Sequence, residues 1–327
     1  MFEKLREYLI LPDWLHLIIL SKIYRNVYLT YIYRLYKKIQ RLLFGKSSIE
    51  LILENEMDQN QEKLTSISLM LLDISIYYSK QLLMEHKKLE IEDCEVGGII
   101  ENVVTKKEFD RSDPSFDIKV QRLKFGITNI QKCRRLSIKI NQMAATKYDK
   151  ENKKHEFELI KLWKLLKPEE ELSNRKSKQW QSIGFQGDDP ATDFRGMGIL
   201  ALKDLTYFSE KYTSLAQKIL SDSQHMVSWY SFALVSIHIT AFTLELLRTR
   251  LLLFQFYGFG IHINTYHEVY CYLFQRFNEY WFQPRDTQIT VMDFENIFQM
   301  YKLMIAKELL RYRTFKPIKN HLRVKSD

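Results

Sequence analysis

Glycine and proline are scarce in this chain, with ten Gly and six Pro in 327 residues. Both counts lie below the average use of about 7% for Gly and about 5% for Pro. An all-β fold would need turn residues about every 8 to 12 positions, and these two residues supply many turns. Since 46% of the residues are hydrophobic and 27% are charged, the composition is that of a folded globular protein. The sequence therefore predicts an all-α fold.

The cysteines and histidines do not form a metal-binding pattern. Cys94, Cys133 and Cys271 lie far apart, and neither a CxxC nor an HExxH motif occurs. No disulfide framework, thiolate zinc site or other metal site is therefore expected. Isolated cysteines are typical of a reducing compartment, so we expect a cytoplasmic protein.

The balance of charge is basic, with a net charge of +9. Many of the cations fall between Ile118 and Tyr148, where the apolar spacing predicts a helix. No zinc-finger, RNP or KH motif accompanies them, and cations in this pattern usually form a solvated helix face. Nucleic-acid binding is therefore not expected.

The segment from Trp14 to Phe44 combines apolar and aromatic residues with a basic stripe. It contains no acidic residue, and Lys22 and Arg25 interrupt it before about 18 uncharged residues, the length of a membrane-spanning helix, accumulate. The pattern is typical of a helix in an anionic membrane interface, and equally of a helix that buries its apolar face against the protein. Both interpretations stay open. The membrane-surface candidates are Lys22, Arg25, Arg34, Lys37, Lys38 and Arg41.

Several local signals predict where helices begin and end. The best linker candidate runs from Asp93 to Ser115, because it contains two glycines and a charge-dense run that ends in Pro114. A helix from His155 should stop at Pro168, and another should end at Gly260. The apolar run from Tyr230 to Phe254 predicts a buried central helix rather than a membrane span. Four tryptophans in apolar settings are expected in the core: Trp163, Trp180, Trp229 and Trp281.

One segment, from Trp180 to Gly198, differs in character from the rest. Four of the chain's ten glycines lie between Gly184 and Gly198, together with Pro190 and three Asp residues. This concentration indicates backbone conformations that other residues avoid. It predicts a structured loop, and structured loops on a rigid scaffold often carry function.

The chemistry of this loop can be narrowed by elimination. It contains no Ser, Cys or His between Gly184 and Gly198, so it cannot by itself build a nucleophile paired with a His base. No GxxxxGK[ST] motif occurs in the chain, and the Asp spacing is not that of an EF-hand. Arg195 remains. Its guanidinium is suited to the phosphates of another molecule, or it pairs inside the loop with Asp188, Asp189 or Asp193.

The same residues closely resemble the signature of the ELMO domain. The matching run is Lys178-Gln-Trp180, Ile183 to Pro190 and Thr192 to Gly198, continued by Leu205 to Glu210. More narrowly, the chain resembles the short ELMO-domain-containing (ELMOD) proteins, which act as GTPase-activating proteins for Arf and Arf-like GTPases. Further matches extend the resemblance to about half of the chain, and they are His155-Glu156, Leu162 to Lys164, Tyr230 to Ala233, Tyr270 to Leu273, Phe277 and Trp281-Phe282.

This resemblance implies a domain plan: a single helical ELMO domain with additional N-terminal helices. The predicted parts are a basic aromatic segment (1–47), an N-terminal helical region (48–150), the ELMO domain (151–310) and a basic tail (311–327). The tail has no assigned role.

The resemblance also implies a function. In the ELMOD family the Arg of an Asp-Phe-Arg-Gly element is regarded as the catalytic arginine supplied in trans, and the element stands here as Asp193 to Gly196, with Arg195 in that position. The partner would be a GTP-bound Arf or Arf-like GTPase, which brings its own GTP and Mg²⁺. The chain would then need no cofactor and no hydrolytic site of its own. The alternative is a non-catalytic module that binds a GTPase or a scaffold.

The remaining loop residues are expected to shape the loop or contact the partner. The three Asp residues are expected to shape the loop and to cap the helix that begins near Gly198. The alternative, which stays open above all for Asp188, is a surface acid in a solvated turn. Gln186 is a candidate either for placing the attacking water or for bonding to the loop backbone. Ala201 and Lys176 depart from the family pattern and leave the choice of GTPase open. The full set is Gly184, Phe185, Gln186, Gly187, Asp188, Asp189, Pro190, Asp193, Phe194, Gly196 and Gly198.

Overall fold

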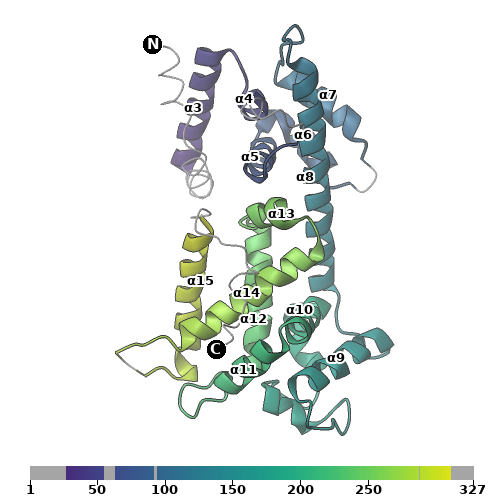
Figure 1. Cartoon of the computed structure of the whole chain (residues 1–327), viewed down its shortest axis with the longest axis vertical. Coiled ribbons are helices and arrows are strands. Elements are labelled where there is room, and N and C mark those ends of the chain that lie inside the picture. The colour runs from purple at the N-terminus through teal and green to yellow at the C-terminus, as the bar shows by residue number, and fades with distance from the viewer. Residues whose placement is uncertain (1–26, 55–62, 92–93, 287, 311–327) are drawn as a thin grey trace. The chain divides into compact units, whose positions relative to one another are not determined.

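The chain folds into helices joined by short connections (Figure 1). The computed structural model describes residues 27–54, 63–91, 94–286 and 288–310, and no strand occurs in these ranges. The predicted all-α fold is confirmed. Lys22, Arg25 and the basic tail lie outside the described residues.

The α-helices have the following bounds in chain order: α3 Val27–Phe44, α4 Ser48–Glu54, α5 Ser66–Tyr77, α6 Leu83–Lys88, α7 Val96–Lys106, α8 Phe116–Ala145, α9 Lys153–Leu166, α10 Gly198–Lys211, α11 Thr213–Ser223, α12 Phe232–Arg248, α13 Leu253–Phe259, α14 Ile263–Trp281 and α15 Phe294–Leu310. The described residues also contain the short 3₁₀ helices η2 Lys80–Leu82, η3 Lys178–Ile183, η4 Pro190–Gly196 and η5 Val291–Asp293. Two of these, η3 and η4, form the glycine-rich loop between α9 and α10.

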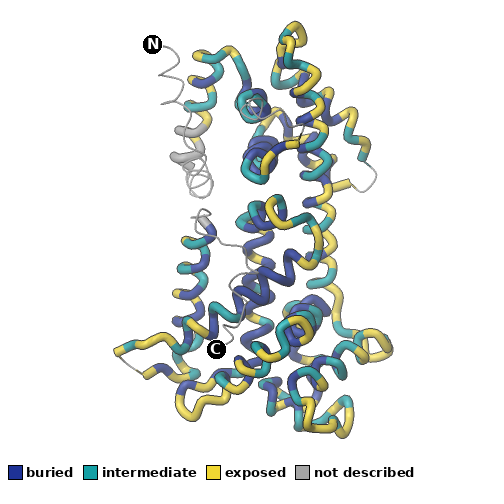
Figure 2. The backbone as a smooth tube through the Cα atoms, viewed as in Figure 1, coloured by how far each residue is buried: buried dark blue, intermediate teal, exposed yellow. Residues whose placement is uncertain are grey.

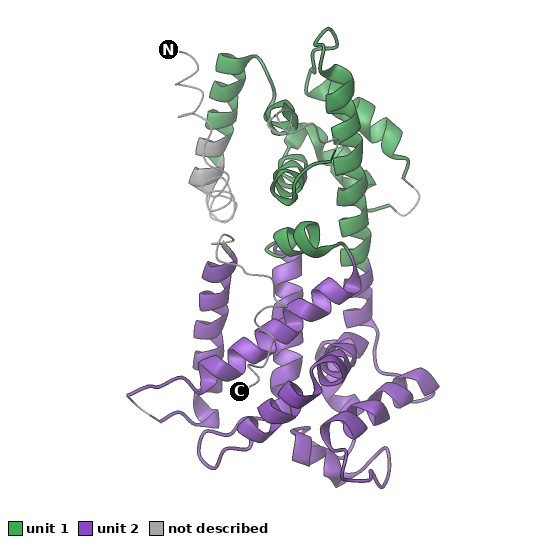
Figure 3. Ribbon diagram, viewed as in Figure 1, with its two compact units in different colours: residues 1–138, 251–261, 310–313 green, residues 139–250, 262–309, 314–327 purple. Residues whose placement is uncertain are grey.

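The chain divides into two compact units (Figure 3). Unit 1 comprises residues 1–138, 251–261 and 310–313, and unit 2 comprises 139–250, 262–309 and 314–327. The long helix α8 therefore contributes to both units. Unit 1 also takes α13, which comes much later in the sequence than its other helices.

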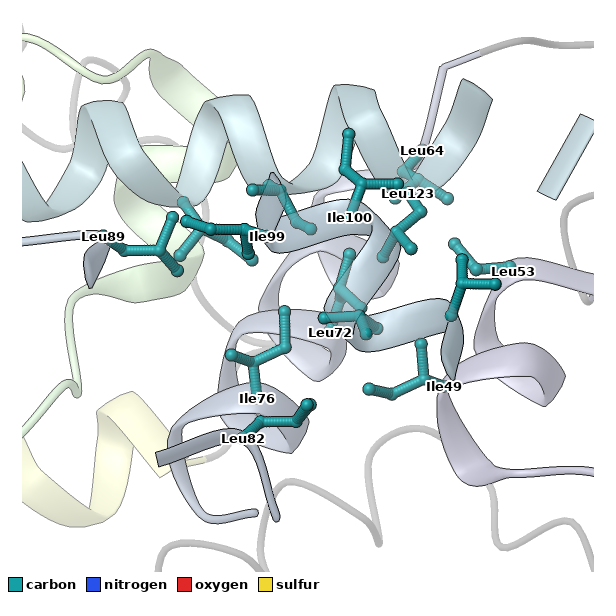
Figure 4. Close-up of a cluster of buried hydrophobic side chains, with 14 of the residues drawn as sticks. Ile49, Leu53, Leu64, Leu72, Ile76, Leu82, Leu89, Ile99, Ile100 and Leu123 are labelled. Atoms are coloured by element: carbon teal, nitrogen blue, oxygen red, sulfur yellow. The ribbon is translucent and has the colours of Figure 1, made fainter. Parts of the chain in front are cut away.

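Unit 1 has its own hydrophobic core, built by α4, α5, α7 and α8 (Figure 4). Ile99 and Val103 of α7 are fully buried in it, so the linker predicted from Asp93 to Ser115 is wrong over the length of that helix. Two glycines, Gly97 and Gly98, weaken a helix by about 1 kcal/mol each. Burying each large apolar side chain gains about 1.5 to 3 kcal/mol, and α7 buries four such side chains. Tertiary packing therefore outweighs the local signal.

Unit 2 is built around α12 and α14, which are largely buried (Figure 2). Trp163, Trp180 and Trp281 lie in the core, as predicted. Trp229 does not, since 47% of its surface is exposed. It lies in the connection between α11 and α12 and not within a helix of the core.

Two predicted helix ends are confirmed. Helix α9 ends at Leu166, just before Pro168, and α13 ends at Gly260, whose φ of +112° is easily reached only by glycine. Helix α12 is the buried helix predicted between Tyr230 and Phe254. In the described part of the chain, no single helix has the length and apolar character to cross a membrane. Helices α12 and α13 have this length and apolar character only when they are counted together across a bend.

Candidate functional site

Gly184 fastens the glycine-rich loop to the start of α12. It ends η3 with a φ of +88°, and a Cβ atom at this position would lie 2.6 Å from the backbone nitrogen of Phe232. The hydroxyl of Ser231 donates a hydrogen bond to the Gly184 carbonyl. Only glycine combines this backbone conformation with so close an approach.

Gly198 fastens the other end of the loop to the end of α8. Its φ is +54°, and a Cβ atom here would lie 2.3 Å from the carbonyl oxygen of Thr146 and 2.7 Å from that of Ala144. The amide of Ile199 donates to the same Thr146 carbonyl at 2.8 Å. The first amides of α10 thus meet the last carbonyls of α8, and each end supplies partners that the other lacks.

The acidic residues stabilise the loop itself, so the prediction that they cap α10 is wrong. Asp189 is the N-cap of η4 and accepts from the Ala191 amide at 3.2 Å. Asp193 accepts from the Gln186 amide at 3.0 Å, and Asp188 is exposed. Asp188 and Asp189 precede the short helix η4, which separates them from α10, and Asp193 lies within η4 and bonds back to the loop. The first turn of α10 has no side-chain cap.

Arg175 is the cation that closes the loop. Its guanidinium lies 2.8 Å from Oδ1 of the buried Asp189, and Lys176 lies 3.4 Å from Oδ2. Burial alone would raise the pKa of Asp189, but the hydrogen bond from Arg175 holds that pKa below its usual range. The Arg175 carbonyl also accepts from the indole of Trp180 at 2.8 Å. Sequence reasoning missed Arg175, because its only signal was a cation shortly before η3.

A row of aromatic rings anchors the loop to the core of unit 2. The rings of Phe194 and Phe185 meet edge to face at 5.6 Å, and Phe185 meets Trp180 at 5.7 Å. Trp180 in turn packs against Trp163 of α9 at 5.3 Å. All four side chains are buried, and these contacts restrain the part of the loop that precedes Arg195.

Arg195 itself points away from these contacts. Its side chain is exposed, and it makes no hydrogen bond or ion pair with the residues that the structure describes. A Cβ atom at the adjacent Gly196 would meet nothing within 4 Å. Since Arg175 holds Asp189, an internal pairing of Arg195 has no support in this geometry. The loop therefore presents an exposed guanidinium, and the backbone beside it at Gly196 has open space around it.

The other candidate residues fall into two groups. Phe185, Pro190, Asp193 and Phe194 are buried or packed within the loop, whereas the side chain of Gln186 is exposed. Gly187 and Gly196 have ordinary backbone conformations, so only two of the loop's four glycines are required by a positive φ. Within the described ranges, no group of three or more His, Cys, Asp or Glu side chains is arranged to hold a metal ion.

The sequence profile of the ELMO/CED-12 family matches residues 138–298, which include the whole loop. ELMO domain-containing protein 2 of Bos taurus is 41% identical over 219 residues, which are 66% of this chain and 73% of the relative. ELMO domain-containing protein 1 of Homo sapiens is 30% identical over 311 residues, or 86% of this chain and 90% of the relative. ELMO domain-containing protein B of Dictyostelium discoideum is 33% identical over 278 residues, or 85% and 95%.

The chain belongs to the ELMO/CED-12 family. The predicted resemblance to the ELMO domain-containing proteins is thus confirmed. The domain boundaries at residues 47, 150 and 310 stay a prediction.

The glycine-rich loop borders a pocket of about 420 Å³ on the surface of unit 2. One wall is formed by the loop residues Gly184 and Phe185, and the other by the connection between α11 and α12. That connection exposes Met226 and Trp229. Exposed large apolar side chains beside a rigid loop are typical of a surface that binds another protein.

Replacing Arg175 with alanine is expected to destabilise this ELMO domain by about 1 to 3 kcal/mol. The buried carboxylate of Asp189 would lose its main partner, and Lys176 would compensate only in part. Chemical denaturation measures the loss.

The ion pair also makes the stability depend on pH. Because the pKa of folded Asp189 lies below its unfolded value of about 3.9, the stabilisation from this carboxylate is present above that pH and is lost as pH falls through the folded pKa. Arg175→Ala should therefore flatten this loss of stability at acidic pH. If the free energy of unfolding depends on pH in the same way in the variant, the ion pair between Arg175 and Asp189 does not stabilise the loop.

Proposed function

We propose that this ELMO-family chain is a GTPase-activating protein for Arf or Arf-like small GTPases and that Arg195 is the side chain it supplies in trans. The observation that carries the proposal is the presentation of Arg195. Its guanidinium is exposed and unpaired among the described residues, while the preceding Phe194 is buried in the core and Gly198, three residues later, is packed against the end of α8. A cation held in this way is suited to a charge that develops on another molecule.

In this mechanism the GTPase brings the nucleotide, the Mg²⁺ ion and the residue that orients the attacking water. The glycine-rich loop docks beside the nucleotide and extends Arg195 toward the β and γ phosphates. The planar guanidinium donates parallel hydrogen bonds and neutralises charge as the phosphoryl group transfers. The chain is then an activator and not an enzyme with a hydrolytic site of its own, and it needs no cofactor.

The rigidity of the loop supports this role energetically. An arginine that must first break an internal ion pair would spend part of its interaction energy before reaching the phosphate. Here Arg175 takes the internal pairing, at 2.8 Å from Asp189. Arg195 therefore has no internal ion pair to break before it reaches the phosphate, and the interaction with developing charge is not reduced by that cost.

The pocket beside the loop supplies a surface for the partner. We expect Trp229→Ala to raise the concentration of this chain needed for half-maximal stimulation by about tenfold or more, because exposed Trp residues are frequent binding hot spots. The maximal rate should change little, since Trp229 lies away from the reacting phosphates in this mechanism. Leu303→Ala removes another exposed apolar side chain of unit 2 and is the matched control. Equal effects of the two substitutions would contradict the docking surface.

Single-turnover GTP hydrolysis by a panel of Arf-family GTPases, with and without this chain, tests the proposed function. We expect at least one member to be accelerated strongly, and the panel also identifies the preferred GTPase. If GTP-loaded members bind the chain and none is accelerated, the non-catalytic module is the correct function. Such a module would use the same surface without the chemistry of Arg195.

A further inference from the structure

Unit 1 contains a second pocket, of about 380 Å³, that the GTPase-activating function does not use. Its lining residues come from α3, the start of α4, the end of α5, η2 and the end of α7. Six cationic side chains line it: Arg34, Lys37, Lys38, Arg41, Lys80 and Lys107. The four on α3 belong to the basic stripe that the sequence predicts, whereas Lys80 and Lys107 come from elements farther along the chain. The fold therefore concentrates the charge of a helix stripe into a pocket.

The rest of the lining is suited to an anion. It supplies neutral groups that can donate hydrogen bonds, namely Ser47, Ser48, Ser75, Tyr78, Ser79 and Gln81. No carboxylate belongs to the lining within the described residues. Outside the lining, the exposed side chain of Glu108 pairs with Arg41.

The cations in this pocket are close enough to oppose one another. Burial and the charge of Lys107 lower the pKa of Lys37 to about 7. Burial and the charge of Arg41 lower the pKa of Lys107 to about 8. The Lys107 ammonium donates to Ser79 at 2.9 Å and to Gln81 at 2.6 Å, so neutral oxygens hold it in place without cancelling its charge. A multiply charged anion would relieve this repulsion.

Helix α3 also exposes apolar side chains beside its basic residues. Leu42 is 85% exposed, and Leu35, Ile39 and Leu43 are also exposed. On a helical wheel these residues form an arc next to the arc that carries Arg34, Lys37, Lys38 and Arg41. Apolar residues adjoining cations on one helix are typical of contact with a membrane interface.

We propose that this pocket binds the polyphosphorylated headgroup of a membrane lipid, while the exposed apolar residues of α3 enter the adjoining acyl boundary. The concentration of cations calls for several negative charges on one small group, which a headgroup with a single phosphate does not supply. The apolar arc assigns that group to a lipid and not to a soluble phosphate. The proposal is independent of Arg195, which lies in unit 2.

Vesicle co-sedimentation of the full chain tests the pocket. Phosphatidylcholine vesicles would contain either phosphatidylserine or phosphatidylinositol bisphosphate, adjusted to equal total negative charge. We expect the chain to prefer the bisphosphate vesicles. Lys38→Gln/Lys80→Gln, which changes two exposed residues, should lower that binding about thirtyfold, from about 1 kcal/mol per cation.

The matched control is Lys124→Gln/Lys132→Gln, which removes two exposed lysines of unit 1 that do not line the pocket. It should lower binding about threefold or less. Equal losses in the two double variants, or no preference between the two kinds of vesicle, would overturn the proposal. Thermal unfolding checks that both variants fold like the unaltered chain.

A second comparison separates a lipid from a soluble ligand. Leu35→Ser/Leu42→Ser should weaken binding to bisphosphate vesicles about tenfold, while the affinity for soluble inositol trisphosphate, measured by calorimetry, stays the same. If this variant binds vesicles as well as the unaltered chain, the pocket serves a free polyphosphate and the lipid proposal fails. Neither measurement involves a GTPase, so its failure leaves the proposed function untouched.

Discussion

Replacing Arg195 with alanine is expected to lower the stimulated rate of GTP hydrolysis by a factor of about 10³ to 10⁵, which corresponds to about 4 to 7 kcal/mol of activation free energy. The loss is large because the guanidinium would act only on charge that grows in the transition state. The fold should not change, since Arg195 is exposed and makes no ion pair with the described residues. Single-turnover hydrolysis at saturating concentrations of this chain measures the effect.

Two further variants show whether the chemistry of the side chain or only its charge matters. Arg195→Lys keeps the positive charge but loses the planar fork, so most of the stimulation should still disappear. Lys178→Ala removes an exposed charge at the start of η3 and should leave the saturating rate nearly unchanged. If both Arg195 variants stimulate normally while folded, Arg195 is not the catalytic arginine. If Lys178→Ala lowers the rate as much as the Arg195 variants do, the loss of stimulation results from weaker docking and not from a catalytic role of Arg195.

Replacing Gly198 with alanine is expected to destabilise unit 2 by about 3 kcal/mol or more. Its φ of +54° disfavours any side chain, and the new Cβ atom would lie 2.3 Å from a backbone oxygen of Thr146. Relief would require α10 to move away from the end of α8, which would break the hydrogen bond from Ile199 to Thr146. Chemical denaturation followed by tryptophan fluorescence measures the change.

Gly196→Ala is the matched control for this substitution. Its backbone conformation is ordinary and its added Cβ atom would meet nothing within 4 Å, so the free energy of unfolding should change by less than about 1 kcal/mol. Equal stability of the Gly198 and Gly196 variants would show that the contact between α8 and α10 does not hold the loop. A loss of GTPase stimulation in the stable Gly196 variant would instead indicate that the partner needs the space beside Arg195.

The sequence predicts the local features of this fold well. Pro168 and Gly260 indicate two helix ends, because a missing amide and a positive φ act within one turn of the chain. The apolar run before Phe254 likewise predicts the buried helix α12. Features that depend on tertiary packing were not predictable in the same way. Gly97 and Gly98 indicate a linker, and only the burial of Ile99 in the core shows that this segment is a helix.

In the candidate site, too, the sequence indicates the important residue but not the contacts that depend on tertiary packing. Elimination of other chemistry and the family resemblance both direct attention to Arg195. Neither distinguishes an exposed guanidinium from an internal pairing, because four cations and three acids lie within about 25 residues of one another. The structure assigns the internal pairing with Asp189 to Arg175. It also shows why the acids do not cap α10, since η4 intervenes and uses Asp189 as its own N-cap.

The most direct test of the central claim compares the affinity of this chain for two states of its GTPase. One state holds a non-hydrolysable GTP analogue, and the other holds GDP with aluminium fluoride and Mg²⁺, which mimics the transferring phosphoryl group. If Arg195 acts on the transition state, the unaltered chain binds the second state much more tightly, and Arg195→Ala removes that preference while retaining affinity for the first state. An Arg195→Ala chain that still prefers the aluminium fluoride state, measured by calorimetry, would contradict the account.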